Sequence, residues 1–445
     1  MAVHPTPKAE DLVVDVSPLV KAESAEMSEG QDLLDAVLPL KDDATIDELV
    51  RIQKLLQRSV EEEPTGAHSL SLDNATVLVN SRLNQEEYKR SQSELYSYPQ
   101  SINVGIHYRC NAKCVFCIGT PPAYQEFSLG LFRDFYEARA ATALRKAHHL
   151  FFCGFGEPLA SPDVLKFIEY LNARFSGPMK SFTTNGIALN RPVLDRMFDG
   201  NFQLQVSLHA SASKLHSKLT GTRTFDEIVN NLRYVCRRRR ETGSRLWVQL
   251  IFVIGAMNVR DIPDFVRLAI DLGVDGVTFS YLTVFTKEQI RQSCFFDKEL
   301  TNEMIQLGRS IGASAGLSMT FPPLFDSAIE NDFAEQQPCR YPWDWIYLST
   351  EGVNYCCYSV ASVGQLKDSS FEEIWNSETY QRLRSDLIHG VANDLCRNCY
   401  KASQTVSIDD FRAHVTGRAA GEEIVKEYEQ MQTESPHTHL EHFGG

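Results

Sequence analysis

The chain has 445 residues, of which 43% are hydrophobic and 23% are charged, and its formal net charge at pH 7 is −14. No segment approaches the eighteen or so consecutive apolar residues of a membrane span, and the N-terminus lacks a basic stretch followed by an apolar one. We therefore expect a cytoplasmic protein that has no membrane partner. Its eleven cysteines are then expected to be metal ligands or free thiols, because the cytosol is reducing.

The negative charge is concentrated in residues 1–70 and 421–445, whereas residues 71–420 carry equal numbers of acidic and basic side chains. One basic run, Arg237–Arg240, falls near the end of a predicted helix, where cations suit the helix dipole and the solvent. Neither interleaved aromatic residues nor a basic domain accompanies this run. No nucleic-acid partner is therefore expected.

The N-terminal part of the chain is predicted to be an acidic extension. Residues 1–43 are acidic, dotted with proline and serine and weakly periodic, which is typical of a mobile leader. Apolar residues recur at helical spacing from Ile46 to Val60, so a helix is predicted there before the break at Pro64.

From about residue 98 the sequence alternates between strand and helix patterns. Strands are predicted near 102–107, 149–153, 180–184, 203–208, 247–254 and 276–282, and helices near 128–147, 162–175, 191–199, 224–242 and 260–272. This alternation predicts an α/β fold of right-handed parallel units, here a partial, open (β/α)6 barrel. Ligands of such sheets gather at the C-terminal ends of the strands. The motifs below follow those ends.

Three cysteines come directly after the first predicted strand. Cys110, Cys114 and Cys117 have the spacing C-x3-C-x2-C. Three thiolates in one tight loop can hold three irons of a cubane cluster and leave one iron open to a small molecule. The alternative is a zinc loop that a distant fourth ligand completes.

Polar motifs follow the next strands. The second strand runs into Cys153-Gly-Phe-Gly-Glu-Pro158, in which Gly154 and Gly156 let the backbone approach a ligand and Glu157 offers oxygen acceptors. The third strand ends in Thr-Thr-Asn-Gly, the fourth in Ser-Leu-His, and an arginine follows in a later loop. These segments supply Asn185, Ser207, His209 and Arg223. A guanidinium can pair with a carboxylate at two points.

In their order and placement, these motifs resemble those of the radical S-adenosylmethionine (SAM) superfamily over roughly residues 98–285. The resemblance implies that a [4Fe-4S] cluster on the three cysteines chelates SAM and cleaves it reductively to a 5'-deoxyadenosyl radical. It also implies that Gly154, Gly156, Glu157, Asn185, Ser207, His209 and Arg223 contact SAM. A low-potential donor such as flavodoxin or ferredoxin would supply the electron.

A second set of cysteines follows residue 320. Cys339, Cys357, Cys396 and Cys399 could enclose a whole cluster with no open iron, and zinc at the same residues is the alternative. Their pattern resembles the twitch domain, a short form of the SPASM domain, and so implies an auxiliary [4Fe-4S] cluster. Cys356 is the competing ligand, but the spacing from Gly352 favours Cys357.

We expect four parts: an acidic extension with a short helix (1–97), a radical SAM core (98–320), a twitch domain (321–412) and an acidic helical or disordered tail (413–445). In domain plan the chain resembles enzymes of the 2-deoxy-scyllo-inosamine dehydrogenase type, which implies oxidation of a small-molecule alcohol. The alternatives are a peptide-modifying maturase, a redox-neutral epimerase or mutase, and a non-catalytic iron-sulfur protein. No residue stands out as the catalytic base.

Overall fold

The computed structural model describes residues 44–62, 70–117, 125–284, 286–325, 339–356 and 362–391, together with residues 393, 396, 426, 429 and 430. The predicted leader and almost all of the predicted acidic tail lie outside these residues. No helix in the described ranges is long and apolar enough to cross a membrane.

Nine strands form one sheet in the order β7-β6-β5-β4-β3-β2-β1-β8-β9. The strands are β1 (Ser101–Gly105), β2 (His149–Cys153), β3 (Met179–Thr184), β4 (Phe202–Ser207), β5 (Trp247–Ile254), β6 (Gly276–Tyr281), β7 (Ser318–Thr320), β8 (Trp345–Leu348) and β9 (Val353–Asn354). Strands β1 to β6 are parallel and lie side by side in chain order. The predicted partial (β/α)6 barrel is confirmed, and its strands lie within one or two residues of their predicted bounds.

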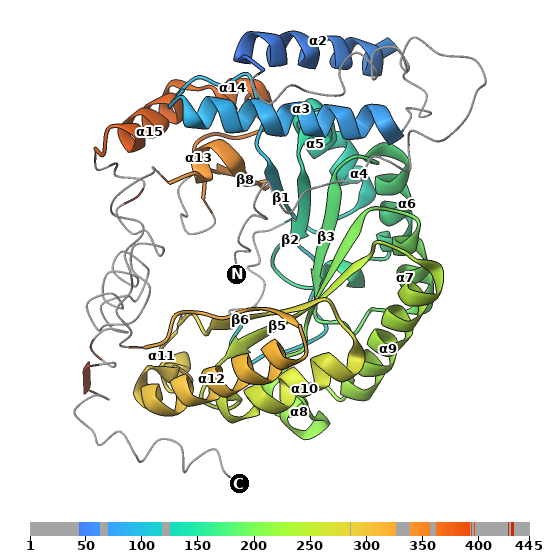
Figure 1. Cartoon of the computed structure of the whole chain (residues 1–445), viewed down its shortest axis with the longest axis vertical. Helices are drawn as coiled ribbons and strands as arrows, with labels where there is room; N and C mark the ends of the chain where they lie inside the picture. Colours follow the sequence, from blue (N-terminus) through green and yellow to red (C-terminus); the bar gives the residue numbers. More distant parts are fainter. Residues whose placement is uncertain are drawn as a thin grey trace.

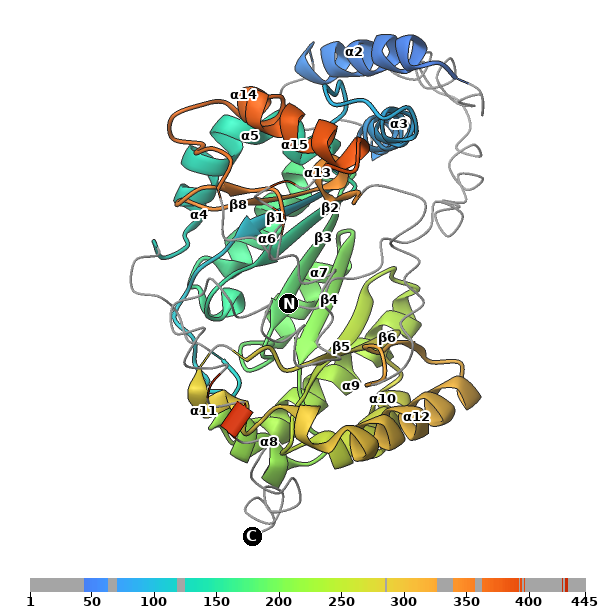
Figure 2. The ribbon, with the colours of Figure 1, turned by 90° about the vertical axis from the view of Figure 1, so that its left-hand side faces the viewer.

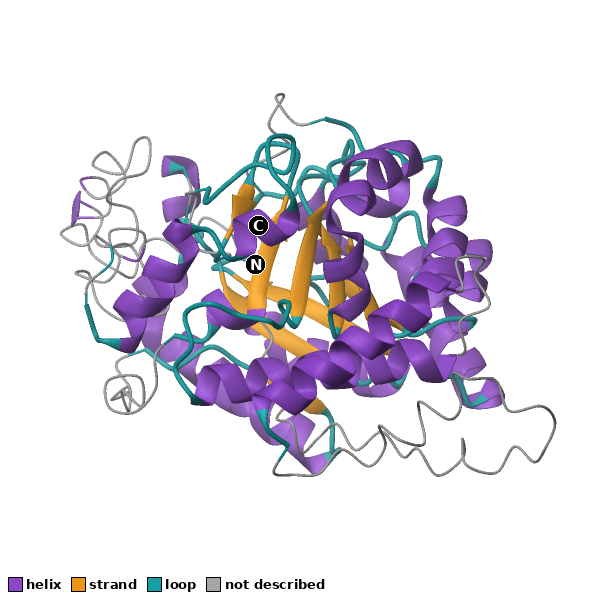
Figure 3. Cartoon of the chain, turned by 90° about the horizontal axis from the view of Figure 1, so that it is seen from above, coloured by secondary structure: helices purple, strands orange, loops and turns teal. Residues whose placement is uncertain are grey.

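Helices surround the curved sheet, as Figures 1 and 3 show. They are α4 (Leu129–Leu131), the π-helix η2 (Phe132–Glu137), α5 (Ala138–Lys146), α6 (Val164–Arg174), α7 (Arg191–Phe198), α8 (Ser213–Thr220), α9 (Phe225–Thr242), α10 (Ile262–Leu272), α11 (Lys287–Ile290) and α12 (Lys298–Ser314). Short 3-10 turns are η3 (Pro158–Ala160), η4 (Val259–Asp261) and η5 (Cys294–Asp297). The five predicted helices are present, whereas α8 and α12 had not been predicted.

The two faces of the sheet differ in chemistry. Alternate residues such as Val104, Phe152 and Leu204 are fully buried in the apolar core that the helices cover. The opposite, inner face carries polar side chains that bond across the strands: Ser181 donates to Gln203, Gln203 to Gln249 and Gln249 to Thr278. The helices are therefore held by hydrophobic burial. Hydrogen bonds satisfy the inner face.

Two further helices precede the barrel. Helix α2 (Ile46–Glu62) confirms the helix predicted from residue 46, and it packs on α3 (Leu70–Lys89), which had not been predicted. Their contact buries Leu56 and Val79. Helix α3 also packs on α5, as the top of Figure 1 shows. The extension is thus attached to the barrel, and the domain boundary at residue 97 stays a prediction.

The C-terminal region joins the same sheet. Strand β8 pairs with β1 in parallel, and β9 turns back beside β8 in the antiparallel sense. Helices α13 (Tyr341–Asp344), α14 (Phe371–Trp375) and α15 (Glu378–Ile388) belong to this region. Residues 345–348 therefore continue the barrel sheet, and the bounds of the twitch domain (321–412) stay a prediction.

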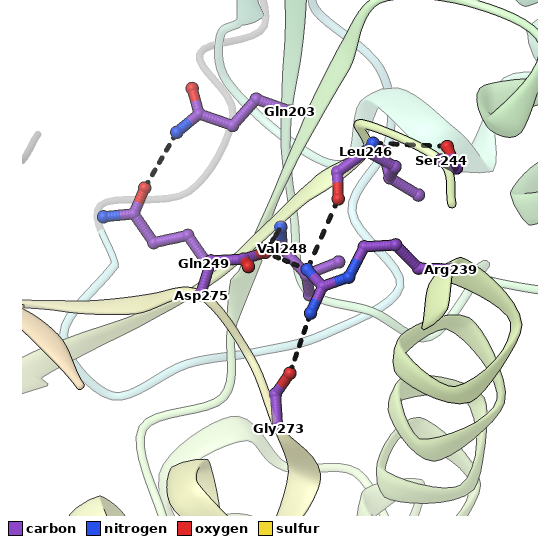
Figure 4. A network of polar contacts seen from close by, with 8 residues as sticks. All are labelled: Gln203, Arg239, Ser244, Leu246, Val248, Gln249, Gly273 and Asp275. Atoms are coloured by element: carbon purple, nitrogen blue, oxygen red, sulfur yellow. Dashed lines mark hydrogen bonds and ion pairs between the residues drawn. The ribbon is translucent and has the colours of Figure 1, made fainter. Parts of the chain in front are cut away.

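The basic run at the end of α9 contains one structural arginine. Arg239 donates to the carbonyl oxygens of Gly273 and Leu246 at 3.0 Å and 3.4 Å and pairs with Asp275. Asp275 also accepts the backbone N–H of Val248 at 2.7 Å, so the pair joins α9 to the starts of β5 and β6 (Figure 4). The Arg239 side chain is 14% exposed.

We predict that Arg239→Ala lowers the free energy of unfolding by about 2 to 4 kcal/mol, because it leaves a half-buried carboxylate without its cation. The neighbouring Arg237 and Arg238 side chains are 63% and 48% exposed, and among the described residues each forms an ion pair with Glu241 alone. Arg237→Ala and Arg238→Ala should change the same free energy by less than about 0.5 kcal/mol. Chemical denaturation of the three variants measures this difference, and three equal values would contradict the structural role of Arg239.

Candidate iron-sulfur and SAM site

The loop with the first three cysteines is held on both sides by backbone hydrogen bonds. On one side, the pairing of β1 with β2 continues beyond both strands, where the N–H of Tyr108 donates to Phe155 at 3.1 Å and that of Glu157 to Tyr108 at 3.3 Å. On the other side, Lys113 and Val115 donate to the last carbonyls of α8 at 2.8 Å and 2.9 Å. The loop is therefore fixed between the Gly-rich turn and α8.

The three thiols of this loop lie near one another. Cys110 and Cys117 are exposed, and none of the described cysteines forms a disulfide. Burial raises the pKa of the Cys114 thiol to about 12, and the charges of Cys117 and Cys110 contribute to the rise. Within the described ranges, no three His, Cys, Asp or Glu side chains are grouped as the ligands of a single metal ion would be. Three thiols that belong to one loop could each bind a different iron of a cluster.

The glycines of the turn after β2 are required by its geometry. A Cβ atom on Gly154 would overlap the carbonyl oxygen of Ile106, at the end of β1. Gly156 has φ 95°, a region that other residues rarely adopt. Both glycines thus allow the turn to pair closely with the start of the cysteine loop.

Glu157 is buried, and its carboxylate joins two strand ends. One oxygen accepts the N–H of Leu159 at 3.0 Å and the hydroxyl of Thr184 at 2.6 Å, and the other accepts the N–H of Asn185 at 2.6 Å. Burial raises the pKa of Glu157 to about 7, although these three donors oppose the rise. The predicted contact of Glu157 with SAM is not tested by these bonds, but both of its oxygens are already used to hold the turn against β3.

Asn185 connects the end of β3 to the first cysteine. Its Nδ2 donates to Asn111 Oδ1 at 2.7 Å and to Cys110 Sγ at 3.7 Å. Its Oδ1 accepts the N–H of Ile187 at 2.9 Å, which fixes the orientation of the amide. The predicted site residues Glu157, Asn185 and Cys110 are therefore brought together, and each positions the next.

His209 lies behind the cysteine loop in a strained backbone conformation, with φ 60°. Its Nδ1 accepts the N–H of Val253 at 3.1 Å, and Asn258 donates to its carbonyl oxygen at 3.0 Å. Burial lowers the pKa of His209 to about 3, so the ring is neutral. The ring meets Phe116 of the loop edge-on, with centroids 4.6 Å apart. The sequence analysis did not select Phe116, although it lies between Cys114 and Cys117 in the cysteine motif.

The other two predicted residues are less constrained. Ser207 is half-buried at the end of β4. Arg223 is exposed in the loop between α8 and α9, where it has no hydrogen bond or ion pair with any described residue. A small apolar hollow beside the loop is lined by Val115, Phe116, Leu219, Val253, Gly255 and Asn258. Contacts of Ser207 and Arg223 with SAM stay predictions.

The second cysteine set begins near the opposite end of β1. Cys339 precedes α13, and Cys356 follows β9, so both lie near the start of β8, which is aligned with the start of β1. The first cysteine loop comes after the end of β1. In Figures 1 and 2, α13 accordingly lies near the top beside α3, and α8 lies near the bottom. Cys396 is half-buried, whereas Cys357 and Cys399 lie outside the described residues.

Family comparisons agree with this geometry. A model described as the radical SAM superfamily matches residues 104–269, and a model described as an iron-sulfur cluster-binding domain, SPASM, matches residues 339–400. The chain contains a radical SAM domain followed by a SPASM domain. Its radical SAM domain binds a [4Fe-4S] cluster and SAM, and its SPASM domain binds auxiliary iron-sulfur.

The similar proteins of known name have several activities. The chain is 21% identical over 299 residues to the tungsten-containing aldehyde ferredoxin oxidoreductase cofactor-modifying protein of Pyrococcus furiosus, which covers 62% of this chain and 80% of that protein. It is 24% identical over 193 residues to the PqqA peptide cyclase of Bradyrhizobium diazoefficiens and 27% over 190 residues to a probable GTP 3',8-cyclase of Aeropyrum pernix. These matches cover 42% and 41% of this chain, and 48% and 51% of the two cyclases.

Solved structures show the same fold. SuiB of Streptococcus suis bound to SAM has a TM-score of 0.52 at 15% identity, and the match covers 82% of this chain and 84% of SuiB. Native anSMEcpe with bound SAM has a TM-score of 0.51 at 14% identity, covering 75% and 98%. At such identities the likeness concerns the fold alone.

We predict that Glu157→Gln weakens SAM binding about tenfold or more. The new amide NH2 group of the glutamine would face one of the three donors that the carboxylate now accepts. That donor would lose its hydrogen bond, at a cost of about 1 to 3 kcal/mol. Iron content should stay near the wild-type value. Glu169→Gln is the matched control, since Glu169 lies on the surface, where it pairs with Arg196. Equilibrium binding of SAM under anaerobic conditions measures the effect, and equal affinities for the two variants would contradict the role of Glu157.

Proposed function

We propose that this radical SAM enzyme oxidises its substrate at a carbon–hydrogen bond and that the SPASM cluster takes up an electron from the substrate. The supporting observation is that the two cysteine sets begin at opposite ends of the paired strands β1 and β8, with the inner face of the sheet between them. When bound, the first cluster and SAM supply a radical that removes a hydrogen atom. Loss of a proton and an electron then completes a two-electron oxidation.

We assign the ligands residue by residue. Cys110, Cys114 and Cys117 would hold the cluster that binds SAM, and Cys339, Cys357, Cys396 and Cys399 would hold the auxiliary cluster. Asn185 would keep Cys110 in place through its amide, and His209 would support the loop through Phe116. These roles need no titrating group, which fits the neutral state of His209.

The inner face of the barrel favours an uncharged, polar substrate. Its residues on β1 to β6 include Asn103, Thr183, Gln205 and Ser280, and none of the inward residues of these six strands is Asp, Glu, Lys or Arg. A nucleoside triphosphate would require cationic partners for its phosphates. Hydroxyl and amide groups can instead be bound by neutral donors and acceptors.

Two substrate classes meet this requirement. A small-molecule alcohol is the first candidate, because the four-cysteine set resembles the twitch domain from which that substrate was expected. A peptide side chain is the second candidate, because PqqA peptide cyclases are among the similar proteins and SuiB has been solved with its precursor peptide SuiA. The similar proteins named above are cyclases or a cofactor-modifying protein, so they do not support a dehydrogenase in particular.

We predict about eight irons per chain after anaerobic reconstitution, and about four when Cys110, Cys114 and Cys117 are all replaced by Ala, since one [4Fe-4S] cluster is lost. Cys236→Ala and Cys294→Ala are matched controls, because both thiols are buried in the hydrophobic core. Iron and zinc analysis measures the outcome. Four irons with one zinc in the unmodified protein would remove the auxiliary cluster from the proposal.

We predict that Cys396→Ala still forms 5'-deoxyadenosine but no oxidised product, because the radical step and the uptake of the electron depend on different cysteine sets. The enzyme would be incubated with SAM and with the small-molecule or the peptide fraction of a cell extract, and both products would be quantified by mass spectrometry. Product from only one fraction identifies the substrate class. Product at the wild-type rate from Cys396→Ala would argue for a redox-neutral reaction.

A further inference from the structure

Helix α3 has a buried polar stripe that binds a neighbouring segment of backbone. Asn80, Asn84 and Glu87 follow one another at intervals of four and three residues, so they share one face of the helix, and all three are fully buried. Buried polar side chains are costly unless they are hydrogen-bonded. The stripe therefore needs partners, and it finds most of them in residues 92–98, which we name the strap.

Side chains of the stripe form hydrogen bonds with the backbone N–H and C=O groups of the strap, as a neighbouring strand would do. The amide of Asn80 accepts the N–H of Tyr98 at 2.8 Å and donates to its carbonyl oxygen at 3.1 Å. The carboxylate of Glu87 accepts the N–H groups of Tyr96 and Ser97 at 2.6 Å and 3.2 Å. The end of the strap that leads into β1 is thus fixed by α3.

The C-terminal region binds the same strap from another side. Asn376 donates to the carbonyl oxygen of Leu95 at 2.8 Å and accepts its N–H at 3.0 Å. Three more side chains donate to strap carbonyls: Trp343 to Gln92 at 2.8 Å, Arg384 to Ser93 at 2.9 Å and Trp375 to Ser97 at 2.9 Å. The strap therefore connects the N-terminal extension to residues that come 251 to 291 positions later.

These contacts converge on the turn that follows Cys339. Asn84 donates to the carbonyl oxygen of Trp343 at 2.7 Å. The ring of Tyr88, one turn further along α3, meets Trp343 edge-on at 5.3 Å and lies 5.1 Å from the guanidinium carbon of Arg340. Arg340 directly follows Cys339 in the chain, so this contact holds the backbone next to the cysteine against α3.

We propose that α3 and the strap position Cys339 and so form part of the auxiliary cluster site. A cluster needs its thiolates in one arrangement, and Cys339 is separated in sequence from the other proposed ligands. Asn84 and Tyr88 hold the backbone on which Cys339 stands, which reduces the entropy lost when the cluster binds. Asn84 and Tyr88 are positioning residues that do not touch the iron. The inference uses the SPASM assignment and is independent of the proposed oxidation.

The test uses the full chain with Cys110, Cys114 and Cys117 replaced by Ala, so that the remaining iron reports the auxiliary cluster alone. Asn84→Asp keeps the size of the side chain but turns an acceptor toward the Trp343 carbonyl. We expect it to lower bound iron at least twofold and to change the electron paramagnetic resonance spectrum of the reduced cluster. Tyr88→Ala should act in the same direction. Tyr88→Phe, which keeps the ring contacts, should restore iron content and spectrum.

Asn172→Asp is the matched control, because Asn172 likewise donates to a backbone carbonyl, that of Arg196 at 3.0 Å, but joins α6 to α7 on the outside of the barrel. This control should keep its iron and its spectrum. In the chain with all cysteines, Asn84→Asp should retain the first cluster and its cleavage of SAM. Full iron and an unchanged spectrum in both Asn84→Asp and Tyr88→Ala would overturn the proposal. Equal iron loss in Asn172→Asp, or loss of both clusters together, would also overturn it, because the effect would then be general unfolding.

Discussion

The position of the first cysteine loop depends on backbone hydrogen bonds between the segments that follow β1 and β2. These bonds extend the pairing of the two strands beyond their ends. Because Tyr108 pairs with the turn after β2, the cysteine loop begins at a fixed place and in a fixed direction. Gly154 permits this approach, and Glu157 carries the constraint on to β3 through Thr184 and Asn185. The amide of Asn185 then returns to Cys110. A closed series of contacts between protein groups thus holds the loop in one position.

The barrel separates two kinds of stabilisation. Apolar burial on the outer face attaches the helices, whereas the inner face is satisfied by hydrogen bonds such as that between Gln203 and Gln249. The inner face of strands β1 to β6 carries no Asp, Glu, Lys or Arg side chain. The same sheet extends through β8 into the C-terminal region, so strand pairing holds the segment that follows Cys339 beside β1.

The sequence was sufficient for the parts of the fold that depend on local patterns. Strands β1 to β6 are buried and apolar on one face, and the cysteine, glycine and asparagine motifs follow their ends, so both could be predicted. Helix α3 was not predicted because its buried face carries the polar residues Asn80, Asn84 and Glu87. In a sequence, such residues are expected on the face of a helix that contacts solvent. The pairing of β8 with β1 is not local, since it joins segments more than 240 residues apart, and no short pattern encodes it. The sequence motif identified Glu157 as a site residue, but its hydrogen bonds to the end of β3 were visible only in the structure.

The central claim is that two clusters occupy the two ends of the β1–β8 pair, with the substrate between them. The most direct measurement is the magnetic coupling between the clusters when both are reduced, observed by electron paramagnetic resonance at several microwave frequencies. Five strand residues span roughly 15 Å, at 3.3 Å per residue, so we expect dipolar splitting that disappears when either cysteine set is replaced by Ala. A spectrum equal to the sum of the two single-cluster spectra, or one that contains a single cluster, would contradict the account.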